Sequence, residues 1–156
     1  FLRDKLNLKT IPSLTDGYLT MHAEIRPDKT YVFHFCRQKD WKNAIETGRY
    51  HGSELDQRDG FIHFSTAGQV RETAALHLKG IQDLVLLQIE ADSLGDALKW
   101  EPSRGGILFP HLYGALHIDQ VIAAYPLQLD EAGQHIFPDL GNVLYLLQIM
   151  FDYKSY

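Results

Sequence analysis

The chain has a single cysteine among its 156 residues and lacks an apolar run of the roughly 20 residues that a membrane-spanning helix needs. One cysteine excludes an internal disulfide framework and a metal site built from several thiolates of one chain. The formal net charge of -5 argues against broad attraction to nucleic acid or to anionic membranes. We therefore expect a protein of the reducing cytoplasm that binds neither bulk nucleic acid nor a membrane.

Several catalytic motifs are also missing. The sequence contains no GxxxxGK[ST], GxGxxG, HExxH or GxSxG in the strand and helix contexts that these motifs require, which removes support for several large enzyme classes. Eight histidines are present, and neutral imidazoles are common metal ligands. The candidates His34, His63 and His111 are widely spaced along the chain, so we expect no metal.

What is present is an ordinary globular composition, with 45% hydrophobic and 22% charged residues, which suits one domain with a substantial core. Strands alternate with helices between residues 30 and 90, and later segments are strand-rich, so the sequence predicts an α+β fold. We expect a single domain over 30–126, an N-terminal extension over 1–29, and a C-terminal extension over 127–156 that packs on the domain or on a partner subunit.

Local patterns predict the elements of this domain. Apolar residues at helical spacing predict a helix over 38–46, ended by Gly48. The continuous apolar run 84–89 predicts a buried strand, and residues 121–125 predict a further one. The segment 100–106 is typical of a flexible loop, a place where functional residues are often found.

Two predicted strands, 31–36 and 60–66, each carry a histidine among apolar residues. Side chains alternate across a strand, so Ile62 and Phe64 point one way while Phe61, His63 and Ser65 point the other, and His34 lies opposite the aromatic face of its own strand. Imidazole titrates near neutrality, which makes His34 and His63 candidate catalytic groups. The alternative is that a backbone carbonyl satisfies each imidazole at the sheet surface.

Other polar residues are weaker candidates. Ser65 and Thr66 precede a helix predicted to begin near Ala67, where a side chain is expected to cap the helix and free amides could bind an anion. Arg37 ends its strand and could meet a phosphate, although a surface arginine is the commoner outcome. Cys36 shares a face with His34, but we expect a buried, inert thiol.

Two further candidates follow the predicted loop. Glu101 could orient a hydroxyl or stabilise positive charge, or it could be a solvated carboxylate. His111 stands in a compact group with Tyr113 and Gly114, and this combination of ring, hydroxyl and flexible backbone favours a site.

The segments Phe33-His34-Phe35, Gly60-Phe61-Ile62-His63-Phe64-Ser65-Thr66 and Phe109-Pro110-His111-Leu112-Tyr113-Gly114, with Gln69-Val70 and Glu101, together resemble a bacterial family, the domain of unknown function 952. The match covers about residues 30–126. The family is similar in architecture to the ADP-ribosyltransferase superfamily, a compact split β-sheet with short flanking helices whose cleft binds NAD. Fold alone does not establish function.

The resemblance implies roles for particular residues. His34 would hold the ribose and amide region of NAD, His63 and Ser65 would line the nicotinamide pocket, and Glu101 or His111 would supply a third position. The expected function is binding of NAD or an ADP-ribosyl nucleotide, with transfer of ADP-ribose or cleavage of NAD. The expected catalytic residues are His34, His63, Glu101 and His111, and the expected nucleotide-binding residues are Arg37, Ser65, Thr66 and Tyr113.

Two other functions stay open. The same cleft could belong to a non-catalytic sensor of a nucleotide or another small molecule. The chain could also be a partner-binding module whose apolar C-terminal segment, within 127–156, forms a homodimer.

Overall fold

The computed structural model describes residues 9–10, 21–22 and 28–140. Short helices and antiparallel sheets make up this part of the chain, which confirms the predicted α+β class. The strands are β1 (Lys9–Thr10), β2 (Met21–His22), β3 (Tyr31–Arg37), β4 (Arg49–Tyr50), β5 (Ile62–His63), β6 (Leu84–Glu90), β7 (Leu98–Pro102), β8 (Leu108–Leu112), β9 (Leu116–His117), β10 (Val121–Leu129) and β11 (His135–Ile136). The helices are α2 (Gln38–Thr47), α3 (Glu54–Asp59) and α4 (Val70–His77), with 3₁₀ turns η1 (Ala91–Ala97), η2 (Arg104–Gly106) and η3 (Ile118–Gln120).

The larger sheet has four strands in the order β11-β10-β6-β3, and every pairing is antiparallel. β6 lies inside this sheet, and all its residues from Leu84 to Ile89 are buried. Burial of both faces explains why its sequence is a nearly continuous apolar run instead of an alternating one.

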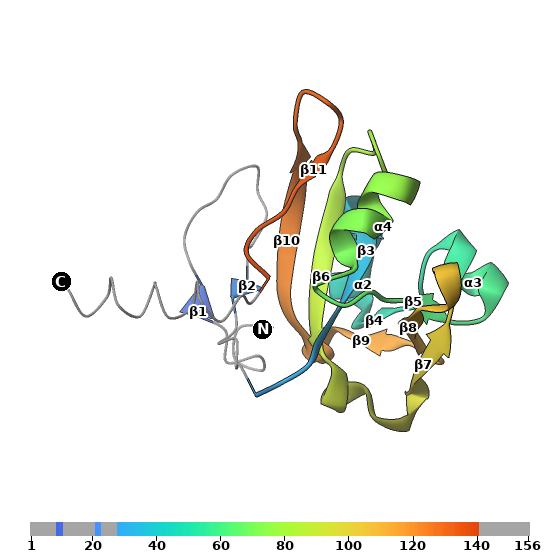
Figure 1. Cartoon of the computed structure of the whole chain (residues 1–156). Coiled ribbons are helices and arrows are strands. Elements are labelled where there is room, and N and C mark those ends of the chain that lie inside the picture. Colours follow the sequence, from blue (N-terminus) through green and yellow to red (C-terminus); the bar gives the residue numbers. More distant parts are fainter. Residues whose placement is uncertain (1–8, 11–20, 23–27, 141–156) are drawn as a thin grey trace, which may run out of the picture.

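Alternation along the strands of this sheet builds two hydrophobic clusters, one on each face. One cluster contains Val32 and Cys36 of β3, together with the buried face of α2. The other contains Phe33 of β3 and Val70 of α4, and Figure 1 shows α4 in front of the sheet. The sheet is therefore covered on both faces.

The smaller sheet has three strands in the order β5-β8-β7. Two backbone hydrogen bonds of 2.8 Å join Phe33 and Ser65, and this bridge ties the chain after β5 to the edge strand β3. The smaller sheet lies at the lower right in Figure 1. Because of the bridge, the two histidine-bearing segments predicted from the sequence come together.

Several predicted boundaries change. The predicted flexible loop over 100–106 is wrong, because β7 continues to Pro102 and pairs with β8, and Arg104–Gly106 forms η2. The predicted domain end at 126 falls inside β10, and burial continues to Leu140. The proposed C-terminal dimer segment lies mostly outside the described residues.

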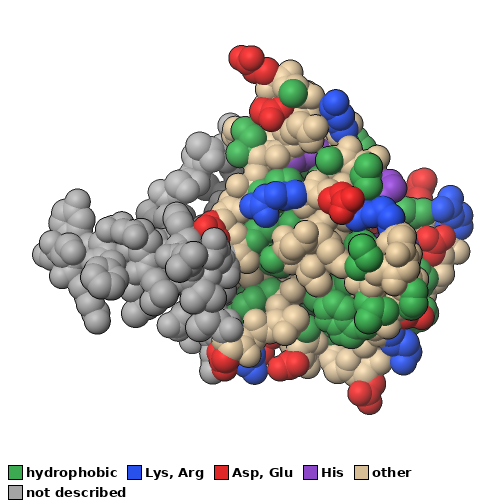
Figure 2. Space-filling model, viewed as in Figure 1, with side chains coloured by type: hydrophobic (Ala, Val, Ile, Leu, Met, Phe, Trp, Pro, Cys, Tyr) green, Lys and Arg blue, Asp and Glu red, His purple; other side chains and the backbone are tan. Residues whose placement is uncertain are grey.

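The surface carries exposed apolar side chains. Figure 2 shows hydrophobic side chains on the lower right of the face in view, the region where Figure 1 places β7 and β8. In these two strands Trp100 is 42% exposed and Leu108 is 50% exposed. No helix within the described residues has the length and apolar character needed to span a bilayer.

Candidate functional site

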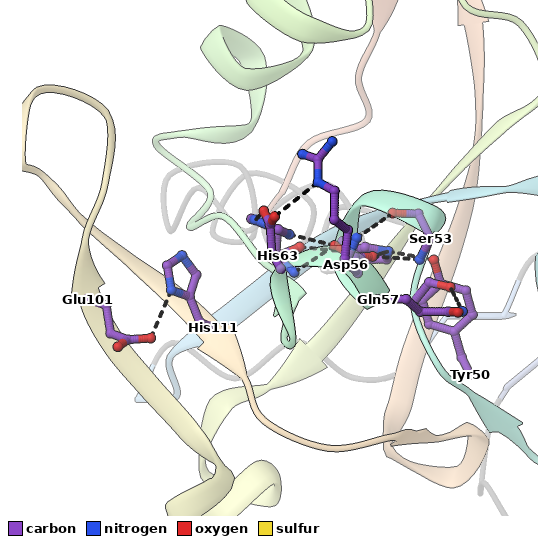
Figure 3. Close-up of polar contacts among 11 residues, drawn as sticks. Tyr50, Ser53, Asp56, Gln57, His63, Glu101 and His111 are labelled. Atoms are coloured by element: carbon purple, nitrogen blue, oxygen red, sulfur yellow. Dashed lines mark hydrogen bonds and ion pairs between the residues drawn. The ribbon is translucent and has the colours of Figure 1, made fainter.

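Asp56 of α3 is the centre of a buried polar network, and only 3% of its surface is exposed. Its Oδ1 accepts hydrogen bonds from the backbone N–H of His63 at 3.1 Å and from the Nδ1–H of His63 at 2.6 Å. Its Oδ2 accepts the backbone N–H of Ser53 at 2.7 Å, within a capping box that begins α3. Figure 3 shows these contacts meeting at Asp56. The helix cap and the histidine thus share one carboxylate.

Burial alone would raise the pKa of Asp56, but the hydrogen bonds that it accepts outweigh burial. The side chain of His63 and the backbone N–H groups of Ser53 and His63 lower this pKa to about 2. Asp56 is therefore a carboxylate across the neutral range. A buried charge of this kind needs a partner, and His63 supplies it.

His63 lies between two carboxylates and is half-buried. Its Nε2 lies 3.0 Å from Oδ2 of Asp59, at the end of α3. The hydrogen bond to Asp56 raises the pKa of His63, burial opposes this, and the charges of Asp56 and Asp59 add to the rise. The geometry favours the imidazolium form.

His34 lies against the backbone of His63 and is 4% exposed. Its Nδ1–H donates to the backbone carbonyl of His63 at 2.6 Å, and its Nε2 accepts from the hydroxyl of Tyr50 at 2.8 Å. Burial lowers the pKa of His34, so the neutral ring with its proton on Nδ1 fits both contacts. With both ring nitrogens in use, His34 positions His63 and does not face a ligand.

His111 of β8 lies directly opposite His63 of β5, and the two ring centroids are 5.6 Å apart. Nδ1 of His111 donates to Oε1 of Glu101 at 3.0 Å, and the hydroxyl of Tyr113 donates to the same oxygen at 2.7 Å. The bond from Tyr113, followed by that from His111, lowers the pKa of Glu101. Figure 3 shows the Glu101–His111 pair beside the Asp56–His63 pair. Nε2 of His111 has no hydrogen-bond partner among the residues that the structure describes.

Phe61 joins the histidines to a cavity. Its ring stacks on that of His111, with centroids 4.1 Å apart and planes at 21°, and lies 5.3 Å from the ring of Tyr113. Phe61 also lines an open cavity of about 650 Å³. The other lining residues are His51, Asp56, Gln57, Gly60, Ile62, Gly114 and Ala115. This volume is in the range of small-molecule sites.

The structure brings together His34, His63, Glu101, His111 and Tyr113, but it places the other predicted site residues elsewhere. Arg37 is exposed where β3 ends and α2 begins. Ser65 is buried, and its hydroxyl contacts that of Thr73 in α4 at 3.3 Å. Cys36 is a buried thiol as predicted, and burial raises its pKa to about 12.

The predicted side-chain cap from Ser65 or Thr66 is wrong. α4 begins at Val70, later than predicted, and the residue before it, Gln69, provides no side-chain cap. Instead the side chain of Gln69 turns back and accepts the backbone N–H of Thr66 at 3.0 Å. The Gln69 side chain therefore bonds to the backbone before α4, while no Thr66 hydroxyl caps the helix.

Sequence reasoning missed Asp56, Asp59 and Tyr50. Ser53 and Asp56 do have the spacing of a capping box, and this signal would have located the start of α3. It does not reveal that the same carboxylate binds His63, because that contact depends on the turn between α3 and β5. In the described residues, no group of three or more His, Cys, Asp or Glu side chains is arranged to hold a metal ion.

Comparison with known proteins identifies relatives of unknown function. A family model described as "Protein of unknown function (DUF952)" matches residues 35–124. Among curated proteins, none matches the chain significantly. The match includes His63, Glu101 and His111, so the candidate site lies largely within the matched region.

Solved structures of one bacterial protein are similar to this chain. The crystal structure of protein CC0527 from Caulobacter crescentus is 44% identical, covers 69% of this chain and 94% of its own, and has a TM-score of 0.67. The solution NMR structure of the same protein is 44% identical over 74% of this chain and 97% of its own, with a TM-score of 0.62. Neither these names nor the family description mentions an ADP-ribosyltransferase, so that likeness remains a prediction.

Proposed function

The chain belongs to the DUF952 family, whose function is unknown, and we propose from its own geometry that the cavity beside Phe61 and the neighbouring His63–His111 pair bind NAD or an ADP-ribosyl nucleotide. The site would cleave or transfer at the ribose. The observation that carries this proposal is the pairing of His63 with His111. The two rings lie 5.6 Å apart, and each is held through Nδ1 by a carboxylate. Histidines oriented in this way are suited to acid–base chemistry.

The two histidines would have different tasks. His63 is held as an imidazolium by Asp56 and Asp59 and can donate a hydrogen bond to a ribose oxygen once a ligand displaces Asp59. His111 keeps Nε2 without a partner among the described residues while Glu101 fixes its Nδ1 proton. A neutral imidazole held in that tautomer can accept a proton at Nε2.

The charges of the site agree with chemistry at a glycosidic carbon. When the bond between ribose and nicotinamide breaks, its electron pair leaves with nicotinamide, and positive charge develops on the ribose. The carboxylates of Asp56, Asp59 and Glu101 surround the histidine pair and would stabilise that charge. An oxygen of water or of an acceptor hydroxyl then bonds to the ribose carbon, and its proton passes to Nε2 of His111.

The cavity beside Phe61 gives the ligand a place to bind. Its volume of about 650 Å³ suits a molecule larger than a single ring, and the stacking of Phe61 on His111 connects the cavity to the proposed acid–base pair. An aromatic wall of this kind is common in small-molecule sites.

A nicotinamide-release assay on the full chain tests the proposal. We expect His111→Gln to lower the rate by roughly 10²–10⁴-fold, because general acid–base groups usually contribute that much. His77→Gln is the matched control, since His77 lies on α4 and contacts Arg104 at 3.4 Å, outside the histidine pair. Equal rates in wild type and His111→Gln, with folding unchanged, would contradict the proposed role of His111.

A sensor without turnover is the second candidate, and one contact favours it. Nε2 of His63 lies 3.0 Å from Oδ2 of Asp59, so this nitrogen already has a partner and is not free to contact a ligand. Saturable binding of NAD without nicotinamide release would assign the cleft to this second function.

A further inference from the structure

We propose that β7 pairs with the β7 strand of a second copy of this chain, about a two-fold axis at Trp100, so that Lys99 of each copy lies against Glu101 of the other. β7 is the outer strand of the sheet β5-β8-β7. An edge strand presents backbone groups that can pair with another chain. The pairing does not depend on which ligand the cleft takes.

The backbone of Trp100 points to the free edge. Trp100 lies opposite Pro110 of β8, and the carbonyl of Pro110 accepts the N–H of Phe64, on the other side of β8, at 2.9 Å. The carbonyl of Ala97 accepts the N–H of Tyr113 at 2.8 Å, which turns Ala97 towards the β8 side. Backbone groups alternate along a strand, so the N–H and carbonyl of Trp100 face away from β8.

The neighbouring residues limit the pairing to this one position. The N–H of Leu98 already bonds to the carbonyl of Gly95, and Pro102 has no N–H to donate. Trp100 therefore offers both a donor and an acceptor on the edge, whereas Leu98 and Pro102 offer only a carbonyl. Two strands related by a two-fold axis at Trp100 would exchange two hydrogen bonds, an arrangement that closes as a dimer.

Charge selects this register. Antiparallel pairing about Trp100 places residue 99 of one copy opposite residue 101 of the other, so Lys99 meets Glu101 twice. A register shifted by one residue, centred on Lys99, would place two lysines opposite each other. Opposite charges across an antiparallel pair stabilise it, and like charges destabilise it.

The apolar side chains agree with this arrangement. Trp100 is 42% exposed although it is large and hydrophobic, and its side chain lies on the opposite face from Lys99 and Glu101 because side chains alternate. Pairing about the two-fold axis would place the two Trp100 rings side by side. On the other face, Lys99 of the second copy would reach the Glu101–His111–Tyr113 group and add a positive charge to the candidate site.

The mass of the full chain in solution tests the proposal, measured by light scattering over a wide concentration range. We expect a dimer of about twice 17.9 kDa. Lys99→Glu alone and Glu101→Lys alone should each shift the mass towards the monomer, because each creates two like-charged pairs. The double variant Lys99→Glu/Glu101→Lys should restore the dimer, because it restores both opposite-charge pairs.

A crosslink tests the register independently of these charges. When two directly opposed residues exchange backbone hydrogen bonds, their Cα atoms lie about 5.5 Å apart. A disulfide can span this separation. Trp100→Cys should therefore form a covalent dimer under mild oxidation, whereas Leu108→Cys, at an exposed position of the neighbouring strand β8, should not. A monomeric wild type would overturn the proposal. A dimer that ignores the single charge reversals, or a Leu108→Cys crosslink as efficient as that of Trp100→Cys, would place the interface elsewhere and also overturn it.

Discussion

Asp56 joins three parts of the molecule through one carboxylate: the start of α3, the backbone of β5 and the imidazole of His63. Because it is buried and charged, removing its charge leaves the groups that donate to it without a full partner. The protonation state of His63 follows from this contact. The buried His34 and the half-buried His63 have opposite pKa shifts.

Histidine titration by NMR should show this contrast. We expect the pKa of His63 to lie above its model-peptide value of 6.5 and that of His34 to lie below it. Asp56→Asn should lower the pKa of His63, because the largest contribution to its rise is the hydrogen bond to Asp56. A pKa for His63 that does not respond to Asp56→Asn would contradict this account of the contact.

The same shift predicts a pH-dependent stability. The folded state binds the proton of His63 more tightly than the unfolded state does, so its contribution is complete below pH 6.5 and is lost as pH rises through the raised pKa. The difference in unfolding free energy between wild type and His63→Gln should therefore shrink from slightly acidic to alkaline pH. Urea unfolding across this range measures it, and a difference that grows with pH would show that the sign is wrong.

For single residues, the sequence predicted which side of a strand a histidine occupies better than it predicted which groups surround that histidine. Alternation along the strands correctly placed His63 apart from Ile62 and Phe64, because that pattern is local. It could not show that His34 is enclosed by Tyr50 and the carbonyl of His63, because these contacts join separate parts of the chain. The strand pattern therefore made His34 and His63 equivalent, whereas the structure gives them different positions.

Among the elements, the turn between α3 and β5 aligns Asp56 with His63. Gly60 follows the last residue of α3 and caps the helix with a φ of 87°, and its N–H bonds to the carbonyl of Asp56 at 2.8 Å. This left-handed conformation is unfavourable for residues with a Cβ. The turn therefore depends on glycine, and Phe61 follows it immediately.

Gly60→Ala should destabilise the protein by about 1–2 kcal/mol, because alanine is strained in the left-handed conformation. No atom lies within 4 Å of the added Cβ, so the expected loss comes from the backbone and not from a clash. Gly68→Ala is the matched control, because Gly68 has no positive φ and its Cβ would meet only Thr66 at 3.9 Å. Denaturant unfolding should separate the two variants, and equal stabilities would contradict the strain argument.

The predictability of the elements follows their hydrophobic patterns. The helix over 38–46 and the strand over 84–89 were confirmed to within a residue or so, because burial imposes a clear period on each. The segment 100–106 was predicted as a loop from its glycines and proline. Its first residues instead complete β7, because Trp100 and Glu101 pair with Pro110 and Phe109 across a hairpin whose turn contains η2.

At the scale of the whole molecule, residues after 126 pack on the domain predicted over 30–126. Leu127 in β10 is 6% exposed, and it belongs to the same hydrophobic cluster as Phe33 and Leu140. Phe137 packs against this cluster and lies edge-on to Phe35 at 6.1 Å. The residues after 126 are therefore part of the core that supports β3.

Leu127→Ala should lower the free energy of unfolding by about 2–5 kcal/mol, the usual range for truncating a buried leucine. Ile136→Ala, at a residue that is 55% exposed, should change it by less than about 1 kcal/mol. Urea denaturation provides the comparison. A loss at Leu127 no larger than that at Ile136 would contradict the place of Leu127 in this core.

The α+β class could be predicted from the alternation of strands and helices along the chain. The relation between the two sheets could not, because it depends on the bridge between Phe33 and Ser65 and on the pairing of His63 with His111. These long-range pairings leave no local pattern in the sequence. They are also what brings the candidate site together.

A calorimetric titration of the purified chain with NAD tests the central claim most directly, with ADP-ribose and nicotinamide as separate ligands. We expect saturable NAD binding that weakens in Phe61→Ala, because Phe61 lines the cavity and stacks on His111. Ile136→Ala, on the exposed part of β11, should bind as the wild type does. Binding of none of the three ligands by the folded wild type would contradict the proposal that this cleft takes an ADP-ribosyl nucleotide.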